Sequence, residues 1–458
     1  MGDGSPVVAG ESGVRQAERT EAESVAWSLR CERWFLRVAA GPAIVLMALA
    51  AVYDRGLANL GLAVLLLGFF VFLPLHWRSV IRDPIAWVAL IFFVWTPFWG
   101  SSLAESYPEY ADLVRSQTQT WLKVLFLPML VTGFWLVRLP RLLPWIPLLI
   151  ATGYLVRVIV FAEWGMLERI FSQGERAEFG IVATHFGLYS LLSLIAAATA
   201  WRTIKTIPSV PARYVLKIFI SMVSLVSLLG VVLAQTRSVW LASILIAVAL
   251  AILVARGLRD KNSRLRTNWL AVFASSVLVG MAAYGLSDIV GARLVQHRET
   301  IVGVLSLDFE GLAYNPIGYR IRAYATGLAT WLEAPFLGHG PGIDQIRMNT
   351  IDDLKMRYVA HFHNEYINLL ATYGLFGFIL FGAGIAAAGR RSRGLIAGGQ
   401  GYTGVLIFVM GASFAIAVFS LFGQSFMSHE MPFVIALLGG LAMAGENIKA
   451  DRQCPHAA

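Results

Sequence analysis

The chain has 458 residues, of which 57% are hydrophobic and only 14% are charged. About a quarter of the residues in an ordinary soluble domain are charged, so this composition excludes a soluble enzyme. It also excludes a disordered chain, which needs low hydrophobicity and high charge. The net charge of +9 does not by itself indicate nucleic-acid binding, because membrane proteins carry surplus Lys and Arg in cytoplasmic loops. With only two cysteines, Cys31 and Cys454, a disulfide-rich secreted scaffold is excluded as well.

Apolar stretches recur along most of the chain, and a membrane-spanning helix needs roughly 20 predominantly apolar residues. They predict an all-α polytopic membrane protein with about 12 transmembrane helices. The stretches are 37–53, 57–75, 84–100, 120–137, 142–161, 181–200, 216–235, 238–255, 268–286, 365–387, 402–422 and 431–446.

The charges of the connecting segments predict an orientation. If the N-terminus lies inside, most Lys and Arg fall in inner segments, as the positive-inside rule requires. We therefore expect a cytoplasmic lead (1–36), helices 1–9 (37–286), a periplasmic loop with catalytic elements (287–364), helices 10–12 (365–446) and a cytoplasmic tail (447–458).

The long loop at 287–364 is expected to be partly helical, because structureless loops of this length are uncommon. Its pattern predicts helices over Arg293–Leu305, Tyr319–Leu332 and Ile343–Tyr358. The glycines and proline of Gly338–Gly342 should break the chain between the last two.

Motifs for nucleotides and metals are missing from the sequence: it has no P-loop, no GxGxxG after a strand, no HExxH and no paired CxxC. We therefore expect no cofactor and no metal. Arg and His instead gather on the outer side, where ionisable groups at a membrane boundary suggest a site. Six of the eight histidines fall there: His185, His297, His339, His361, His363 and His429.

Three arginine positions are candidates for binding an anionic ligand. Arg237 lies in a tight outer turn between two apolar stretches, where the flanking Gln235, Thr236 and Ser238 favour a functional role over simple snorkelling. Arg320 and Arg322 cannot share a helical face, whereas Arg320 and Tyr324 can. Either arginine of that pair could point at a ligand.

Two further arginines are weaker candidates for substrate binding. Arg157 lies near the apolar end of the fifth stretch, where a charge is costly to place. Arg176 lies in the third outer loop, among alternating charges that are more typical of surface ion pairs.

The segment His361–Asn368 begins the tenth stretch. Asn364 is expected to cap that helix, whose N-terminus favours anions. The neighbouring His361 and His363 are placed to meet a phosphate or to take a proton, or else only to cap the helix at the interface.

Three local patterns in this part of the chain resemble the O-antigen ligase and polymerase superfamily of bacterial envelopes. The first is Thr236-Arg237-Ser238. The second is Arg320-x-x-x-Tyr324 followed by Ala334–Gly342, and the third is His363–Tyr366 followed by Tyr373–Gly377. The sequence differs from the family pattern at Tyr324, where Trp is usual, at Ser238, where Gly is frequent, and in the additional His361.

The resemblance implies a metal-independent glycosyltransferase of the Gram-negative inner membrane. Such a ligase transfers O-antigen from undecaprenyl pyrophosphate to the lipid A–core oligosaccharide on the periplasmic face. We expect Arg237 and Arg320 to stabilise the leaving pyrophosphate and His363 to act as the base in an inverting displacement. The alternative role of His363, which the sequence does not separate from the first, is to donate a hydrogen bond to the pyrophosphate. The substrate-binding candidates are Arg157, Arg176, Arg322, His361, Asn364 and Tyr324.

Two alternatives stay open on the sequence. An O-antigen polymerase shares the same architecture. A lipid or glycan transporter also has many spans, although transporters place polar residues near the membrane midplane, whereas this chain places its Arg and His near the outer boundary.

Overall fold

The computed structural model describes residues 26–173, 175–259, 302–303, 306, 312, 314–426, 428 and 430–453. Within these residues the chain is helical and contains no strand, which confirms the predicted all-α class. The α-helices are α2 (Gly41–Ala50), α3 (Arg55–Ile81), α4 (Pro84–Ser106), α5 (Ala111–Val124), α6 (Phe126–Arg138), α7 (Ile146–Val160), α8 (Trp164–Gln173), α9 (Ala183–Ile204), α10 (Val210–Leu233), α11 (Arg237–Arg259), α15 (Pro316–Glu333), α16 (Ile343–Thr350), α17 (Glu365–Ser392), α18 (Gln400–Ser420) and α19 (Met431–Gln453).

Short helical turns join several of these helices. They are the π-helical η1 (Leu36–Ala40) and the 3₁₀ turns η2 (Pro108–Tyr110), η3 (Pro140–Trp145), η4 (Met356–Tyr358) and η5 (Arg393–Gly398).

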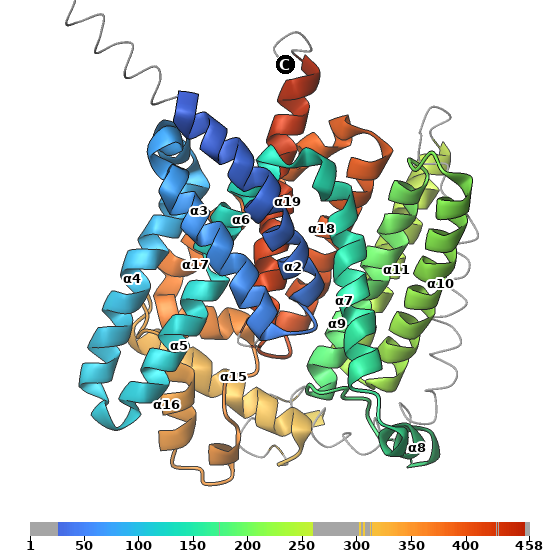
Figure 1. The fold of residues 1–458 in the computed structure, drawn as a ribbon. Coiled ribbons are helices and arrows are strands. Elements are labelled where there is room, and N and C mark those ends of the chain that lie inside the picture. The colour runs from blue at the N-terminus through green and yellow to red at the C-terminus, as the bar shows by residue number, and fades with distance from the viewer. Residues whose placement is uncertain are drawn as a thin grey trace, which may run out of the picture.

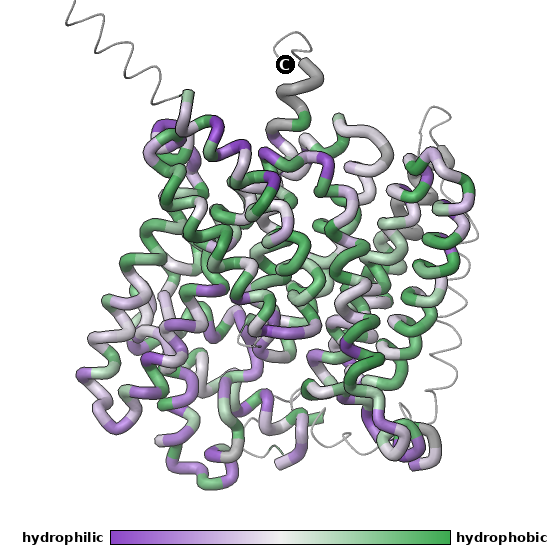
Figure 2. The backbone as a smooth tube through the Cα atoms, in the orientation of Figure 1, coloured by the Kyte–Doolittle hydropathy of each residue, from purple (hydrophilic) through white to green (hydrophobic). Residues whose placement is uncertain are grey.

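Nine helical stretches of the described chain are long and apolar enough to cross a membrane. They correspond to nine of the predicted spans. The predicted spans 238–255 and 431–446 correspond to the shorter apolar helices Arg237–Ala249 and Met431–Glu446. The predicted span 268–286 lies outside the described residues, and so does the predicted helix Arg293–Leu305 apart from Val302 and Gly303, which are helical. Figure 2 shows hydrophobic residues concentrated midway along the helices and hydrophilic residues towards both ends.

Side-chain caps set the start of several helices. Asp54 caps α3 by accepting the backbone N–H of Leu57, and Asp83 caps α4 by accepting that of Ile85, each at 2.8 Å. Asn315 caps α15 by accepting the N–H groups of Ile317 and Gly318. Each cap satisfies donors that a helix start leaves open.

The helix expected over Ile343–Tyr358 is shorter than predicted, because α16 ends at Thr350 and only a 3₁₀ turn follows. The Asp353 carboxylate accepts the backbone N–H of Lys355 at 3.0 Å and the hydroxyl of Tyr314 at 2.7 Å. Such local side-chain bonds compete with helical ones, so the chain turns here.

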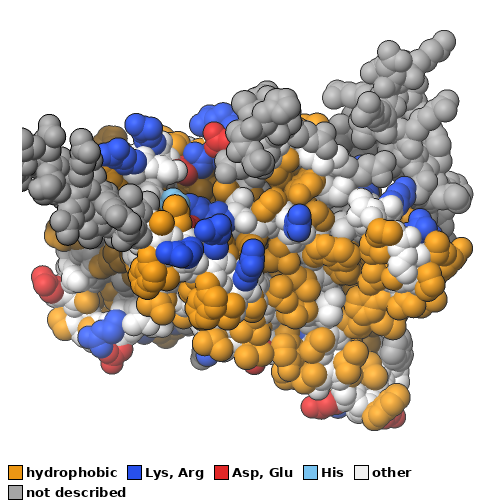
Figure 3. Space-filling view, turned by 45° about the horizontal axis from the view of Figure 1, so that its top comes forward, with side chains coloured by type: hydrophobic (Ala, Val, Ile, Leu, Met, Phe, Trp, Pro, Cys, Tyr) orange, Lys and Arg blue, Asp and Glu red, His pale blue; other side chains and the backbone are white. Residues whose placement is uncertain are grey.

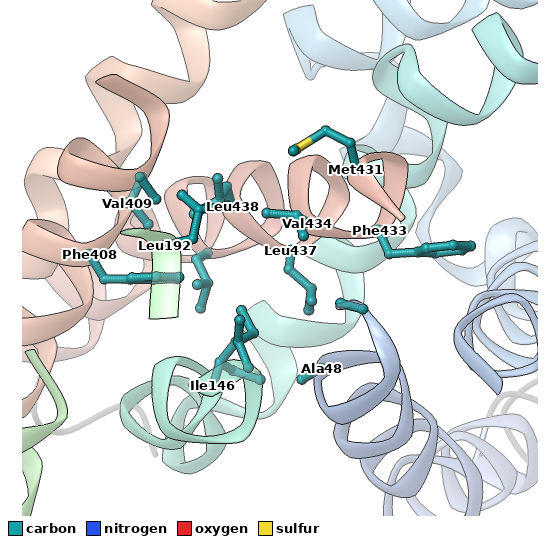
Figure 4. Packing of buried hydrophobic residues seen from close by; sticks show 14 of the residues in the cluster. Ala48, Ile146, Leu192, Phe408, Val409, Met431, Phe433, Val434, Leu437 and Leu438 are labelled. Atoms are coloured by element: carbon teal, nitrogen blue, oxygen red, sulfur yellow. The ribbon is translucent and has the colours of Figure 1, made fainter. Parts of the chain in front are cut away.

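The hydrophobic core lies around α19, which packs along α6 and also against α17. In Figure 4, Val434, Leu437 and Leu438 of α19 lie among Ile146 of α7 and Leu192 of α9, all buried. The helices therefore form one bundle with α19 in its interior.

The two ends of this bundle differ. At one end, here called the loop end, α8, α15 and α16 lie, with α15 lying across the bundle (Figure 1). At the opposite end, here called the terminal end, α19 finishes. Lys and Arg side chains stand out on the terminal end in Figure 3. Basic residues at the helix termini there are Arg78, Arg82, Arg138, Arg202, Lys205, Arg390 and Arg391.

Candidate active site

The glycine-rich segment after α15 docks onto a break in α17. The backbone N–H groups of His339 and Gly340 donate to the carbonyls of Ala371 and Thr372, each at 2.9 Å. In the other direction, Leu375 N–H donates to the Pro335 carbonyl at 2.8 Å, and Phe376 N–H donates to that of Phe336 at 3.1 Å. The loop thus replaces helical hydrogen bonds that α17 gives up where it kinks.

Glycine is required on both sides of this junction. Gly374 has φ 64° and ψ −170°, a backbone conformation that is nearly restricted to glycine. A Cβ there would lie 2.3 Å from the Phe336 carbonyl, and one at Gly338 would lie 2.4 Å from the carbonyl oxygen of Thr372. The two glycine-containing patterns noted in the sequence therefore position α15 against α17.

The start of α17 joins three elements at one carbonyl. Asn364 caps the helix as predicted, because its Oδ1 accepts the N–H groups of Tyr366 and Ile367 at 3.0 and 3.1 Å. Its Nδ2 donates to the carbonyl of Leu421 at 3.2 Å. The Tyr324 hydroxyl, from α15, donates to the same oxygen at 3.0 Å. Asn364 and Tyr324 thus meet at the segment 421–430, here called the α18–α19 loop.

His361 and His363 stand next to each other directly before α17. Their ring centroids are 4.1 Å apart, and the backbone N–H of His363 donates to Nδ1 of His361 at 3.1 Å. Between them, Phe362 is fully buried. His363 has φ 55°, in the left-handed region that non-glycine residues seldom adopt.

Burial and nearby positive charge favour the neutral form of both histidines. Burial, followed by the charge of Arg320, lowers the pKa of His363 to about 4. Burial and the neighbouring His363, His185 and Arg320 lower the pKa of His361 to about 3. A neutral imidazole near pH 7 is able to accept a proton, as a general base must.

The structure separates the two arginines of α15. The charge of Arg320 acts on His361, His363 and Tyr324, whose pKa values it lowers. Arg322 turns the other way: its Nη2 donates to the carbonyl of Leu312 at 2.9 Å, and its guanidinium lies 4.6 Å from the ring centre of Tyr314.

Arg157 lies in a different place, deep among protein acceptors. Its side chain is buried and donates to the carbonyls of Val52, Phe179 and Gly180 at 2.9–3.1 Å. It also forms an ion pair with Glu430 at 3.4 Å. These contacts tie α7 to the segment before α9 and to the α18–α19 loop.

Arg237 and Arg176 lie at the surface of the loop end. Arg237 is the exposed first residue of α11, directly after the buried Thr236, whose hydroxyl donates to the carbonyl of Ala183 at 3.3 Å. Arg176 is also exposed, and the next residue, Ala177, donates its N–H to the carbonyl of Leu233 at the end of α10.

The α18–α19 loop and two buried carboxylates were not among the predicted site residues. Gln424 Nε2 donates to the Asp344 carboxylate at 2.6 Å, and Phe426 N–H donates to Glu365 at 3.2 Å. Burial raises the pKa of Asp344 to about 6. The available signal was the polar run Gly423–Glu430 between two apolar stretches, at the end that already held the other candidates.

The remaining outer histidines have different surroundings. His185 of α9 donates through Nε2 to the carbonyl of Gln424 at 3.2 Å, and His339 donates to that of Thr330 at 2.8 Å. His297 and His429 lie outside the described residues. Within those residues, no group of three or more His, Cys, Asp or Glu is arranged to hold a metal ion.

The fold and this site define a multi-pass helical membrane protein with a guanidinium and two neutral imidazoles gathered at one end. The sequence model of the family described as O-antigen ligase matches residues 222–382. This match supports placing residues 222–382 in the O-antigen ligase and polymerase superfamily. The match includes Arg237, Arg320, His363 and the Gly338–Gly374 junction, whereas Arg157 and the α18–α19 loop lie outside it. No curated protein matches the chain.

Proposed function

We propose that the protein is an O-antigen ligase, a glycosyltransferase that moves O-antigen polysaccharide from undecaprenyl pyrophosphate to the lipid A–core oligosaccharide. The observation that carries the proposal is the pair of contacting imidazoles, His361 and His363, at the capped start of α17, on which the charge of Arg320 acts. All of these residues lie within the segment that matches the O-antigen ligase family.

The chemistry of transfer fits these residue types. When the bond between the anomeric carbon and the pyrophosphate oxygen breaks, the electron pair stays on that oxygen and negative charge grows there. The planar guanidinium of Arg320 can bind this charge with two N–H groups, and the positive N-terminal end of the α17 dipole also stabilises it. Arg237 is the second arginine that we assign to the donor, with Arg176 as a surface contact.

His363 accepts the proton that the acceptor hydroxyl loses as its oxygen attacks the anomeric carbon. A single displacement of this kind inverts the anomeric centre. Tyr324 and Asn364 hold the surrounding segments together at the Leu421 carbonyl. We assign Arg157 and Arg322 to structural roles, because their guanidinium groups bind carbonyls of the protein itself.

We place the loop end in the periplasm and both termini in the cytoplasm of a Gram-negative bacterium. The support is the cluster of Lys and Arg at the terminal end, as the positive-inside rule describes. To test the orientation, cysteine is introduced at exposed positions in a background without Cys31 and Cys454. An impermeant thiol reagent should label Glu109→Cys at the loop end of intact cells and spare Lys205→Cys at the terminal end. The reverse pattern would overturn the orientation.

Lipopolysaccharide from a strain that lacks the protein tests the reaction. For a ligase, the whole O-antigen ladder should disappear while the lipid A–core remains. A core that carries a single repeat unit would instead indicate a polymerase of the same superfamily. An unchanged ladder would reject both.

A further inference from the structure

The backbone of His363 is held in an unfavourable conformation. Its φ of 55° lies in the left-handed region, where a side chain crowds the following carbonyl. Residues remain in such a region only when their surroundings fix them, and they concentrate at functional sites.

His361 provides one contact that fixes this conformation. Its Nδ1 accepts the backbone N–H of His363 at 3.1 Å, across two positions of the chain. An Asn or Asp side chain makes the same bond to the backbone two residues further on in an Asx turn. Phe362, between the two in the sequence, is fully buried.

We infer that His361 is the positioning residue of the proposed base: its imidazole accepts the His363 N–H and so holds the His363 ring in place to receive a proton. The inference rests on the proposed function. It goes beyond it by assigning the additional histidine, which departs from the family pattern, to His363 rather than to the substrate.

The same hydrogen bond fixes which proton His361 carries. Because Nδ1 accepts a hydrogen bond, the proton of the neutral ring lies on Nε2. Neither nitrogen of His361 is then open to a substrate proton. This leaves His363 as the base of the pair.

The test compares three substitutions of His361 in the full-length protein in nanodiscs, with lipid-linked O-antigen as donor and lipid A–core as acceptor. Asparagine keeps an acceptor for the His363 N–H, alanine removes it, and phenylalanine keeps a ring without an acceptor. We expect His361→Asn to keep the single-turnover rate within about 3-fold, while His361→Ala and His361→Phe lose roughly 10- to 100-fold. Donor affinity should be unchanged in all three, because Arg320 is retained.

Rescue by asparagine distinguishes positioning from other roles. If His361→Asn is as inactive as His361→Ala, the imidazole itself takes part in the chemistry and the inference is wrong. Full activity of His361→Ala, or full activity of His361→Phe, would also overturn it. His363→Ala is measured beside them: if that variant transfers normally, the proposed function of His363 has failed, independently of His361.

Discussion

Arg157 and Arg320 lie at the same end of the bundle but in opposite surroundings. The guanidinium of Arg157 is enclosed by the carbonyls of Val52, just after α2, and of Phe179 and Gly180, and by the Glu430 carboxylate. Within the described residues, Arg320 makes no hydrogen bond to a protein acceptor, and its positive charge lowers the pKa of His361 and His363. An arginine whose donors are occupied by its own chain serves the fold, whereas one that lacks protein acceptors is available to an anion.

The largest expected effect is at Arg320. Arg320→Ala should lower single-turnover transfer by ~10²–10³-fold, as removal of a donor to a developing oxyanion does. Arg320→Lys should also be poor, since an ammonium group cannot bind two oxygens side by side. Both variants should be recovered from the membrane in normal amounts with unchanged thermal stability. Near-normal transfer by both variants would remove Arg320 from the donor site.

Arg157 should show the converse behaviour. Arg157→Leu leaves the largely buried Glu430 without its cation, and breaking a fully buried pair in this way typically costs ~3–5 kcal/mol, which is an upper bound here. We expect a marked loss of thermal stability in nanodiscs, partly restored when Glu430→Leu is added. A stable Arg157→Leu protein that fails to bind donor would return Arg157 to the substrate-binding set.

A matched pair of glycines on α17 tests how the site is built. Gly374→Ala places a Cβ in a backbone conformation that alanine disfavours and within 2.3 Å of the Phe336 carbonyl. The backbone strain alone should cost ~1–3 kcal/mol of stability. The substitution should lower both stability and transfer. Gly382 has no neighbouring atom within 4 Å of its Cβ position, so Gly382→Ala should be neutral or slightly stabilising. Equal effects of the two substitutions on thermal stability would contradict the docking of the glycine segment.

The smallest expected effect is on pH dependence. Transfer requires neutral His363, whose pKa is lowered to about 4. The rate should therefore stay level between about pH 6 and 8 and fall as the pH drops through about 4. Arg320→Lys keeps the positive charge and should leave this acid limb in place. Arg320→Gln removes the charge that disfavours protonation of His363. The acid limb of the pH–rate profile of this variant's residual activity should therefore move to higher pH. No movement would show that Arg320 does not act on His363.

The sequence predicted the helical class, the placement of the Arg and His candidates towards one end, and the cap at Asn364, because these depend on apolar periodicity and on local side-chain chemistry. It also showed that Arg320 and Tyr324 share a helical face. The direction of Arg322 depends on Tyr314 and Leu312, which no spacing rule brings together.

The acceptors of Arg157 are mainly backbone carbonyls, which every residue carries and which sequence therefore cannot rank. The α18–α19 loop was missed for a related reason. Gln424 and Phe426 meet Asp344 and Glu365 across long sequence separations, so their pairing arises only once the bundle has folded.

The junction between α15 and α17 also has a mechanical consequence. Backbone hydrogen bonds on both sides of Gly374 fix the chain directly after α15, so α15 is anchored at its C-terminal end. Arg320 lies near the opposite tip, and Tyr324, one turn further along, is fastened to the α18–α19 loop by one hydrogen bond. A small rotation of α15 about this junction would displace Arg320, near its N-terminal end, further than residues near Trp331. Such a rotation would change the position of the guanidinium more than that of the glycine junction.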